Sequence, residues 1–194
     1  LRFEWSEPVA ASVFRRGEAL WVVFDRPSTV DVAAIQGVAG DQISEMVQIP
    51  HPVATVLRTM TKRGVNPVLE REGLTWVLDF AEQSLTTLSP VATAAQPDSP
   101  VGARIFLPVP EPGKAVSLVD PDMGEYFVTV PVLPLGYGVT NLYEYPQFRI
   151  RPSSQGIVIE PLIDTLRIRP VRQGIGITST RTLEISPTTD LDMA

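Results

Sequence analysis

The sequence contains no cysteine and a single histidine, His51. The absence of thiols excludes disulfides, thiolate zinc sites, iron–sulfur clusters and a cysteine nucleophile. One histidine without a Gly-x-Ser-x-Gly motif also leaves no serine triad of the usual kind. One imidazole plus carboxylates is a poor match to the nitrogen and sulfur ligands of zinc sites. We therefore expect no metal site and no cofactor, and we interpret Pro50-His51-Pro52 as an exposed loop.

Long apolar runs and an excess of basic charge are also missing. The longest apolar stretches, such as Leu20 to Phe24, are as long as a strand and fall short of the roughly 18 residues that cross a bilayer. The 16 basic residues against 22 acidic ones give a net charge of −6, opposite to the balance typical of nucleic-acid-binding domains. Hydrophobic residues make up 44% of the chain, which is enough for a core. We therefore expect a folded chain without a membrane span and without a nucleic-acid partner.

What the sequence does contain favours strands. Its 19 prolines are spread along the chain and leave few windows for a long helix, because a proline inside a helix costs about 3 kcal/mol. Between them, short apolar segments alternate with Gly- and Pro-containing turns, a pattern typical of sandwiches and barrels. The sequence predicts an all-β fold, with short antiparallel strands in one or two β-sandwich-like domains and little helix. Beyond residue 100, the expected strands are 103–109, 115–119, 126–132, 147–150, 157–161, 165–168, 175–178 and 182–185.

In the first half, one strand–turn–strand sequence motif (the repeated phrase) occurs twice. The turn Arg15-Arg16-Gly17 is followed by an apolar strand with a tryptophan, and so is the turn Arg71-Glu72-Gly73. The two copies form a loose internal repeat of hairpins. Between them we expect a short helix over 31–37, capped by its first residue and stopped by its last, and strands over 43–49 and 53–61. The three tryptophans are expected to fill the core of this half: Trp5, Trp21 and Trp76.

This repeated phrase resembles the strand–turn–strand pattern of AMIN-type modules, small β-sandwich domains of bacterial cell-envelope proteins. The resemblance covers residues 1–88. It implies a non-catalytic module with a periplasmic or cell-envelope location that binds peptidoglycan or septal components, and it carries no individual binding residue across. We interpret 89–100 as a linker or long loop and 101–194 as a second β-rich domain. The ends of the chain are typical of a piece of a longer polypeptide.

Aromatic residues gather in the second half and form the candidate binding site. They surround a Gly- and Pro-rich segment, and tyrosines on such loops provide contact area for a partner or glycan at low entropy cost. The alternative is a loop folded down over the sandwich with its rings half buried. The candidate residues are Tyr126, Tyr137, Tyr143, Tyr145 and Phe148.

Charged residues provide weaker candidates. Four arginines alternate with isoleucines in two expected strands and would form a basic stripe if those strands were neighbours: Arg149, Arg151, Arg167 and Arg169. The acidic segment 120–125 has carboxylates at alternate positions but lacks the glutamate that ends a calcium loop, so we expect a turn between strands. Glu70 and Glu72 are interpreted as a solvated hairpin face rather than as paired catalytic carboxylates.

From the sequence we therefore expect a non-enzymatic binding or scaffold domain of a bacterial cell-envelope protein, contacting peptidoglycan or a protein partner. Two alternatives stay open. One is a structural subunit of a flagellar, pilus or phage-like assembly, which would use the exposed edges of short strands. The other is a carbohydrate-active enzyme that works through carboxylates.

Overall fold

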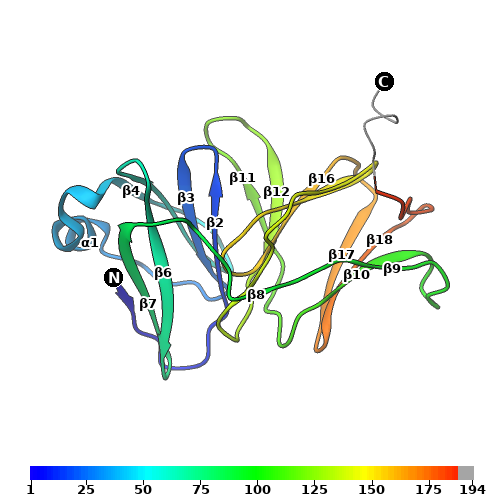
Figure 1. Cartoon of the computed structure of the whole chain (residues 1–194), viewed down its shortest axis with the longest axis horizontal. Helices are drawn as coiled ribbons and strands as arrows, with labels where there is room; N and C mark the ends of the chain where they lie inside the picture. Colours follow the sequence, from blue (N-terminus) through cyan, green and yellow to red (C-terminus); the bar gives the residue numbers. More distant parts are fainter. Residues whose placement is uncertain (188–194) are drawn as a thin grey trace.

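The computed structural model describes residues 1–187. Its strands form four antiparallel sheets and one two-stranded parallel pair, and the four sheets follow one another along the long axis of the molecule (Figure 1). We number them sheets 1 to 4 from the end nearest the N-terminus. Within the described residues the helical elements are α1 (Val32–Ala39) and the short 3₁₀ turn η1 (Gly40–Gln42). The prediction of an all-β fold with little helix is therefore confirmed.

Sheets 1 and 2 form the first sandwich. Sheet 1 contains, in spatial order, β1 (Arg2–Phe3), β7 (Thr75–Glu82) and β6 (Val65–Glu72). Sheet 2 contains β2 (Ala11–Arg16), β3 (Ala19–Phe24), β5 (Thr55–Thr61) and β4 (Ile43–Ile49). The two strands expected between the repeated hairpins are thus present as β4 and β5.

Each copy of the internal repeat forms a hairpin, β2–β3 in sheet 2 and β6–β7 in sheet 1. Gly17 and Gly73 open the two turns, each with φ near +60°, a backbone conformation that glycine adopts without steric penalty. Both hairpins contribute to one core, with Val13 and Leu20 from the first copy and Trp76 and Leu78 from the second. The repeat is therefore realised as two hairpins that face each other across a sandwich.

Helix α1 lies at the outer end of this sandwich (Figure 1). Asp31 caps it by accepting a hydrogen bond from the backbone N–H of Ala34 at 3.0 Å. The helix continues through Gly37, where the sequence predicted its end, and finishes at Ala39. Gly40 follows as the first residue of η1, and its φ of +65° is a backbone conformation that glycine adopts without steric penalty.

Sheets 3 and 4 form the second sandwich. Sheet 3 contains β11 (Val116–Val119), β12 (Tyr126–Val130), β16 (Ile157–Pro161), β15 (Phe148–Arg151) and β14 (Tyr143–Tyr145). Sheet 4 contains β17 (Leu166–Val171), β18 (Gly174–Ser179), β10 (Arg104–Pro108) and β9 (Ala94–Gln96). The parallel pair joins β8 (Ser89–Pro90) to β13 (Tyr137–Gly138). The strand expected over 182–185 is absent, although Leu183 is buried in the core.

The segment 89–100, expected to be a linker or long loop, contains both β8 and β9. Val91 lies in the hydrophobic core of the second sandwich, and β9 pairs with β10. The apolar and small residues of this segment are thus incorporated into the second half. The proline and small residues of this segment are typical of a loop. Its two strands form only by pairing with β13 and β10, which come later in the sequence, so no pattern within the segment indicated them.

The two sandwiches share a buried interface, which we call the seam. All six residues of β3 are buried: one face of the strand packs toward sheet 1, and Ala19, Trp21 and Val23 pack toward sheet 3. In the seam the Trp21 ring meets the Phe127 ring edge-on, with centroids 5.3 Å apart. Trp21 therefore fills the seam rather than the core of the first half.

Hydrogen bonds tie the same two halves together at the edge of sheet 2. The backbone N–H of Ala11 donates to the carbonyl of Val132 at 3.1 Å, and that of Val13 donates to the carbonyl of Gln155 at 2.9 Å. Inside the seam, the Thr129 hydroxyl donates to the Ser12 hydroxyl at 2.8 Å. Since buried polar groups need partners, these bonds fix how the two sandwiches sit on each other.

Candidate functional site

Two of the five candidate aromatic residues are core residues. Tyr145 is 4% exposed and Phe148 is fully buried, and their rings stack with centroids 4.7 Å apart. Burial raises the pKa of Tyr145, whose hydroxyl lies 2.8 Å from that of Thr93. A partner could reach these two rings only if the second sandwich opened, so they do not belong to a surface site.

The other three aromatic residues do not form one surface either. Tyr137 and Tyr143 are half buried against the core of the second sandwich. Tyr126 lies at the start of β12 and is 50% exposed. The Gly- and Pro-rich segment is therefore folded onto the sandwich, which is the alternative that the sequence left open, and Tyr126 alone keeps a largely exposed ring.

The four arginines of the expected basic stripe lie in two different sheets. Arg149 and Arg151 are on β15 in sheet 3, whereas Arg167 and Arg169 are on β17 in sheet 4. The condition for a stripe, that the two strands are neighbours, is not met. Arg149 pairs with Glu144 at 3.4 Å, and Arg151 pairs with Glu160. The two halves of the expected stripe therefore have different surroundings.

One surface hollow does bring members of the two candidate sets together. It has a volume of about 550 Å³ and lies between the β11–β12 edge of sheet 3 and the segment that enters β17. Tyr126, Leu162 and Arg167 line it, and Leu162 is 49% exposed. An exposed aromatic ring and an aliphatic side chain beside a guanidinium make a surface that can bind both apolar and polar groups of a ligand.

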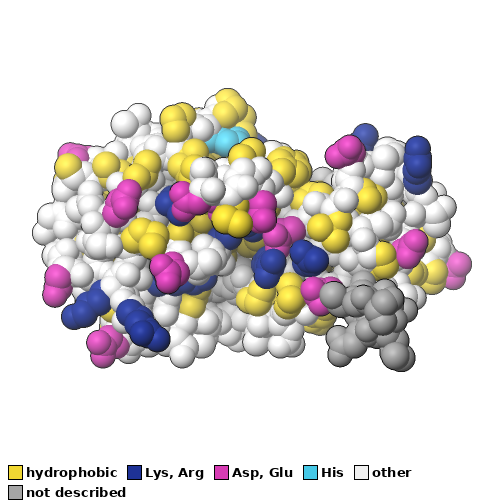
Figure 2. Space-filling view, turned by 90° about the horizontal axis from the view of Figure 1, so that it is seen from above, with side chains coloured by type: hydrophobic (Ala, Val, Ile, Leu, Met, Phe, Trp, Pro, Cys, Tyr) yellow, Lys and Arg dark blue, Asp and Glu magenta, His cyan; other side chains and the backbone are white. Residues whose placement is uncertain are grey.

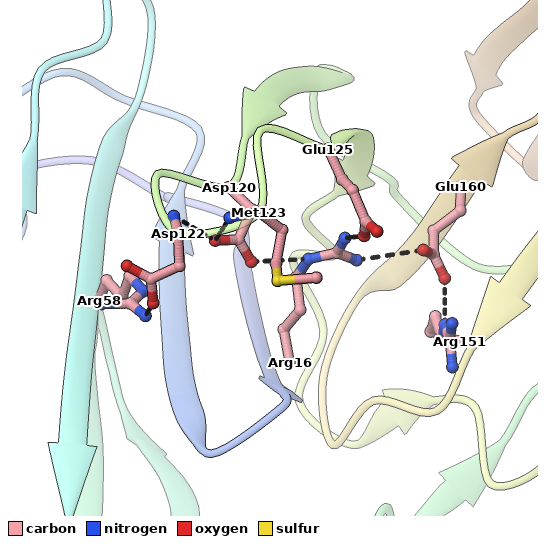
Figure 3. A network of polar contacts seen from close by, with 8 residues as sticks. All are labelled: Arg16, Arg58, Asp120, Asp122, Met123, Glu125, Arg151 and Glu160. Atoms are coloured by element: carbon pink, nitrogen blue, oxygen red, sulfur yellow. Dashed lines mark hydrogen bonds and ion pairs between the residues drawn. The ribbon is translucent and has the colours of Figure 1, made fainter.

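Sequence reasoning missed a cluster of charged residues at the rim of the seam, which we call the Arg16 cluster (Figure 3). Arg16 ends β2, next to the Gly17 turn. Its guanidinium points toward the turn between β11 and β12, from which Asp120 and Glu125 extend, and toward Glu160 on β16 (Figure 3). One arginine of the first half thus meets three carboxylates of the second.

The contacts of Arg16 use all three guanidinium nitrogens. Nε donates to Asp120 Oδ2 at 3.0 Å, Nη2 to Glu125 Oε2 at 2.5 Å, and Nη1 to Glu160 Oε2 at 3.2 Å. The guanidinium also lies 4.5 Å from the centroid of the Phe127 ring. Charge-assisted hydrogen bonds of this kind are the strong ones in proteins, and here they join the two sandwiches.

Burial makes this pairing necessary. The side chains of Arg16, Asp120 and Glu160 are only 11%, 7% and 10% exposed. Burial alone would raise the pKa of Glu160, but the hydrogen bonds and charges of Arg151 and Arg16 outweigh it and hold that pKa below its ordinary value. Glu160 is therefore a stable carboxylate at neutral pH.

Around the cluster lies a groove of about 440 Å³. A further ion pair, Arg58 with Asp122, lines it together with Met60 and Met123. The space-filling view shows basic and acidic side chains interleaved where the two halves meet (Figure 2). Because three of the arginines that line this groove are ion-paired with four of its carboxylates, most of its charge is neutralised within the protein.

The turn over 120–125 was expected from the sequence, and the structure places it between β11 and β12. Its partner was not detectable, because Arg16 is separated from Asp120 by 104 residues and from Glu160 by 144. His51, expected in an exposed loop, is half buried, and its Nε2 lies 3.0 Å from the carbonyl oxygen of Ser117. It too bridges the two halves.

The described residues thus form four stacked antiparallel sheets, and the ion pairs of the Arg16 cluster join the two sandwiches at the seam. Comparisons with protein-family models, with characterised proteins and with solved structures found no match. Among residues 1–187, no three His, Asp or Glu side chains are grouped so as to hold a metal ion. In the same residues, no helix is long and apolar enough to cross a membrane.

Proposed function

We propose that this chain is a non-catalytic binding or scaffold domain of a bacterial cell-envelope protein, which contacts peptidoglycan or a protein partner. The observation that carries the proposal is the hollow lined by Tyr126, Leu162 and Arg167. It lies on a stack of sheets whose seam is fixed by packing and by ion pairs. A preformed surface of this kind binds with little loss of conformational entropy.

The electrostatics favour binding over carboxylate catalysis. A glycosidase acid needs a carboxyl group with a raised pKa, whereas the pKa of Glu160 is lowered. Three further carboxylates of the groove, those of Asp120, Asp122 and Glu125, are held in ion pairs with Arg16 and Arg58. Ion pairs of this kind are expected to hold the two sandwiches together.

Two of the sheet edges disfavour assembly by strand addition. The edge strands β6 and β17 contain Pro67 and Pro170. A proline cannot donate a backbone hydrogen bond, and natural proteins use it to block pairing at exposed edges. Strand addition at these two edges is therefore disfavoured.

The envelope location rests on the resemblance of residues 1–88 to AMIN-type modules. In support, both copies of the phrase that carries it form hairpins with the same glycine-led turn, and both face one core. Two similar hairpins that pack against each other around one core are consistent with a small β-sandwich module.

Co-sedimentation of the purified chain with isolated bacterial sacculi tests this proposal, with capture from envelope lysate run in parallel. We expect the parent chain to pellet with sacculi or to retain one dominant partner, and Tyr126→Ser to weaken that interaction. Val38→Ser is the matched control, because Val38 is 82% exposed on α1 at the opposite end of the stack. A folded chain that neither pellets with sacculi nor retains a partner would contradict the proposal.

A further inference from the structure

The outer face of sheet 4 gathers three arginines from strands far apart in the sequence. Arg167 and Arg169 point outward from β17, while Leu166 and Ile168 pack inward. On the other side of β18 lies β10, which begins with Arg104. Arg104 therefore lies on the same face as Arg167 and Arg169, which the sequence did not indicate.

Glycines on the central strand leave room between these arginines. Gly176 pairs with Arg169 on one side and with Phe106 on the other. A Cβ atom at Gly176 would lie 3.4 Å from Nη1 of Arg104, so this guanidinium reaches over the glycine toward β17. The arginines line a hollow of about 330 Å³, together with the hydroxyl-bearing residues Thr178, Ser179 and Thr180.

The side chain of Arg104 is held in place by its neighbours. Its Nε donates to Gln96 Oε1 at 2.6 Å, and its guanidinium lies 4.9 Å from the centroid of the Phe106 ring. Both contacts leave the charge itself without a counter-ion. The guanidinium is therefore positioned in advance, which lowers the entropy lost when a ligand binds.

Within the part of the chain that the structure describes, none of the three arginines of this face is ion-paired to a carboxylate. Within residues 1–187, six arginines form ion pairs with acidic side chains, and Arg104, Arg167 and Arg169 are not among them. The three charges line one hollow, and the strands that carry them, β17 and β10, are separated by β18 alone, roughly 10 Å by the usual strand spacing. Like charges at such distances repel, and a bound anion would relieve that repulsion.

We propose that this face, which we call the arginine face, binds the oxyanion groups of an anionic polymer, either phosphates or carboxylates. Guanidinium groups bind these planar or tetrahedral oxyanions through paired hydrogen bonds. The three arginines lie on two strands, β17 and β10, on either side of β18, and this spread favours a ligand with several oxyanions over a single ion. Because the whole chain carries a charge of −6, the attraction is local and is screened by salt.

This inference rests on the proposed binding function and assigns the chemistry of its ligand. Arg167 also lines the hollow that contains Tyr126, so the two surfaces are continuous. A polymer lying along them would place its oxyanions on the arginine face and an apolar or ring-shaped part against Tyr126 and Leu162.

Titration calorimetry with defined polymers provides the test. Long-chain polyphosphate supplies phosphates, poly-L-glutamate supplies carboxylates, and inorganic phosphate supplies a single oxyanion. The variants are Arg104→Gln, Arg169→Gln and their combination, with Arg169→Lys to keep the charge but not the paired hydrogen bonds. Arg63→Gln is the matched control, because Arg63 is an exposed arginine on the first sandwich. Circular dichroism of each variant establishes that it is folded.

We expect binding of at least one polymer at low salt, tighter than binding of inorganic phosphate. Since the double variant removes two guanidinium groups and their charge-assisted hydrogen bonds, it should weaken binding at least about tenfold. Arg63→Gln should leave it unchanged, and Arg169→Lys should lie in between. Preference for one polymer identifies phosphate or carboxylate as the source of the oxyanion.

Equal binding by the parent chain and the folded double variant would overturn the inference, as would binding of neither polymer. Because the net charge of −6 argues against a nucleic-acid partner, the inference excludes nucleic acids, and tighter binding of single-stranded DNA than of either polymer would overturn it. Sacculi separate this inference from the proposed function. If sacculi bind the parent chain and the double variant equally well, the inference about the arginine face is wrong and the proposed function stands. If the polymers bind but sacculi and envelope proteins do not, the proposed function is wrong and the inference about the arginine face stands.

Discussion

The Arg16 cluster and the arginine face use the same residue type in opposite ways. Arg16 donates to three carboxylates in the seam, whereas Arg104, Arg167 and Arg169 share a hollow in which none of them is ion-paired to an acidic side chain of residues 1–187. The difference follows from solvent access. A guanidinium that is 11% exposed has lost most of its contact with water, and burying its charge without counter-ions would strongly destabilise the fold. A guanidinium on an outer face is stabilised by water and stays available for a ligand.

The two regions illustrate two different roles of arginine, in stability and in recognition. In the seam, the counter-ions come from the same chain, so the charges contribute to how the halves are held. On sheet 4 the counter-ions are to be supplied from outside, so the charges contribute to recognition. Stability measurements should therefore respond strongly to changes in the first region and weakly to changes in the second.

The largest effect is expected when Arg16 is replaced by methionine, which keeps much of its length and removes its charge. Asp120 would then remain buried without its ion-pair partner, and Glu160 would keep only Arg151. Breaking a buried ion pair in this way destabilises proteins by about 3–5 kcal/mol. Urea unfolding measured by tryptophan fluorescence gives the free energy of unfolding. Arg63→Met is the control, with an expected change within about 0.5 kcal/mol. A loss below about 1 kcal/mol for Arg16→Met would show that the cluster is not a structural lock.

A smaller and pH-dependent effect is expected for Glu160→Gln. The pKa of Glu160 is lower in the folded protein than its ordinary value, so its charge stabilises the fold above about pH 4.3, the ordinary pKa of a glutamate. That contribution is lost as the pH falls through the folded pKa. The parent chain should be more stable than the variant by about 1–3 kcal/mol at pH 7, as is typical of hydrogen bonds to charged groups, and the gap should close in acid. Urea titrations at neutral and acidic pH measure it, and a gap that widens in acid would contradict the assigned direction.

The smallest effect on stability is expected for the double change Arg167→Gln and Arg169→Gln on the arginine face. Both side chains are exposed on an edge strand, so the free energy of unfolding should change by less than about 0.5 kcal/mol. At low salt the change should favour the variant, because it relieves like-charge repulsion, and added salt should remove the difference. Thermal and urea unfolding at two salt concentrations measure this. A clear loss of stability would mean that these arginines are structural, and the contrast with Arg16 would disappear.

Much of the fold was predictable because its signals are local. Alternating apolar residues and glycine-led turns indicated the hairpins around Gly17 and Gly73, and the segment 120–125 was correctly interpreted as a turn. These features depend on residues within one hairpin, where the period of two and the turn chemistry act directly.

The candidate site was less predictable because it depends on pairing across the chain. Whether β15 and β17 are neighbours is decided by the order of strands in sheets 3 and 4, and no local pattern encodes that order. The same holds for Arg104, which joins Arg169 only through β18. Tyr145 and Phe148 were also ambiguous, because an aromatic ring near glycine and proline fits both a surface loop and a core.

The seam also has a consequence for the order in which the chain is made. During synthesis the first sandwich emerges early, but one face of sheet 2, including Phe14 and Trp21, is covered only by β11, β12 and β16. The ribosome must therefore translate as far as Val158 before these rings are enclosed. Nascent chains with exposed apolar faces are prone to aggregate. A ribosome stalled between the two halves would hold a half-finished product that depends on chaperones for its solubility.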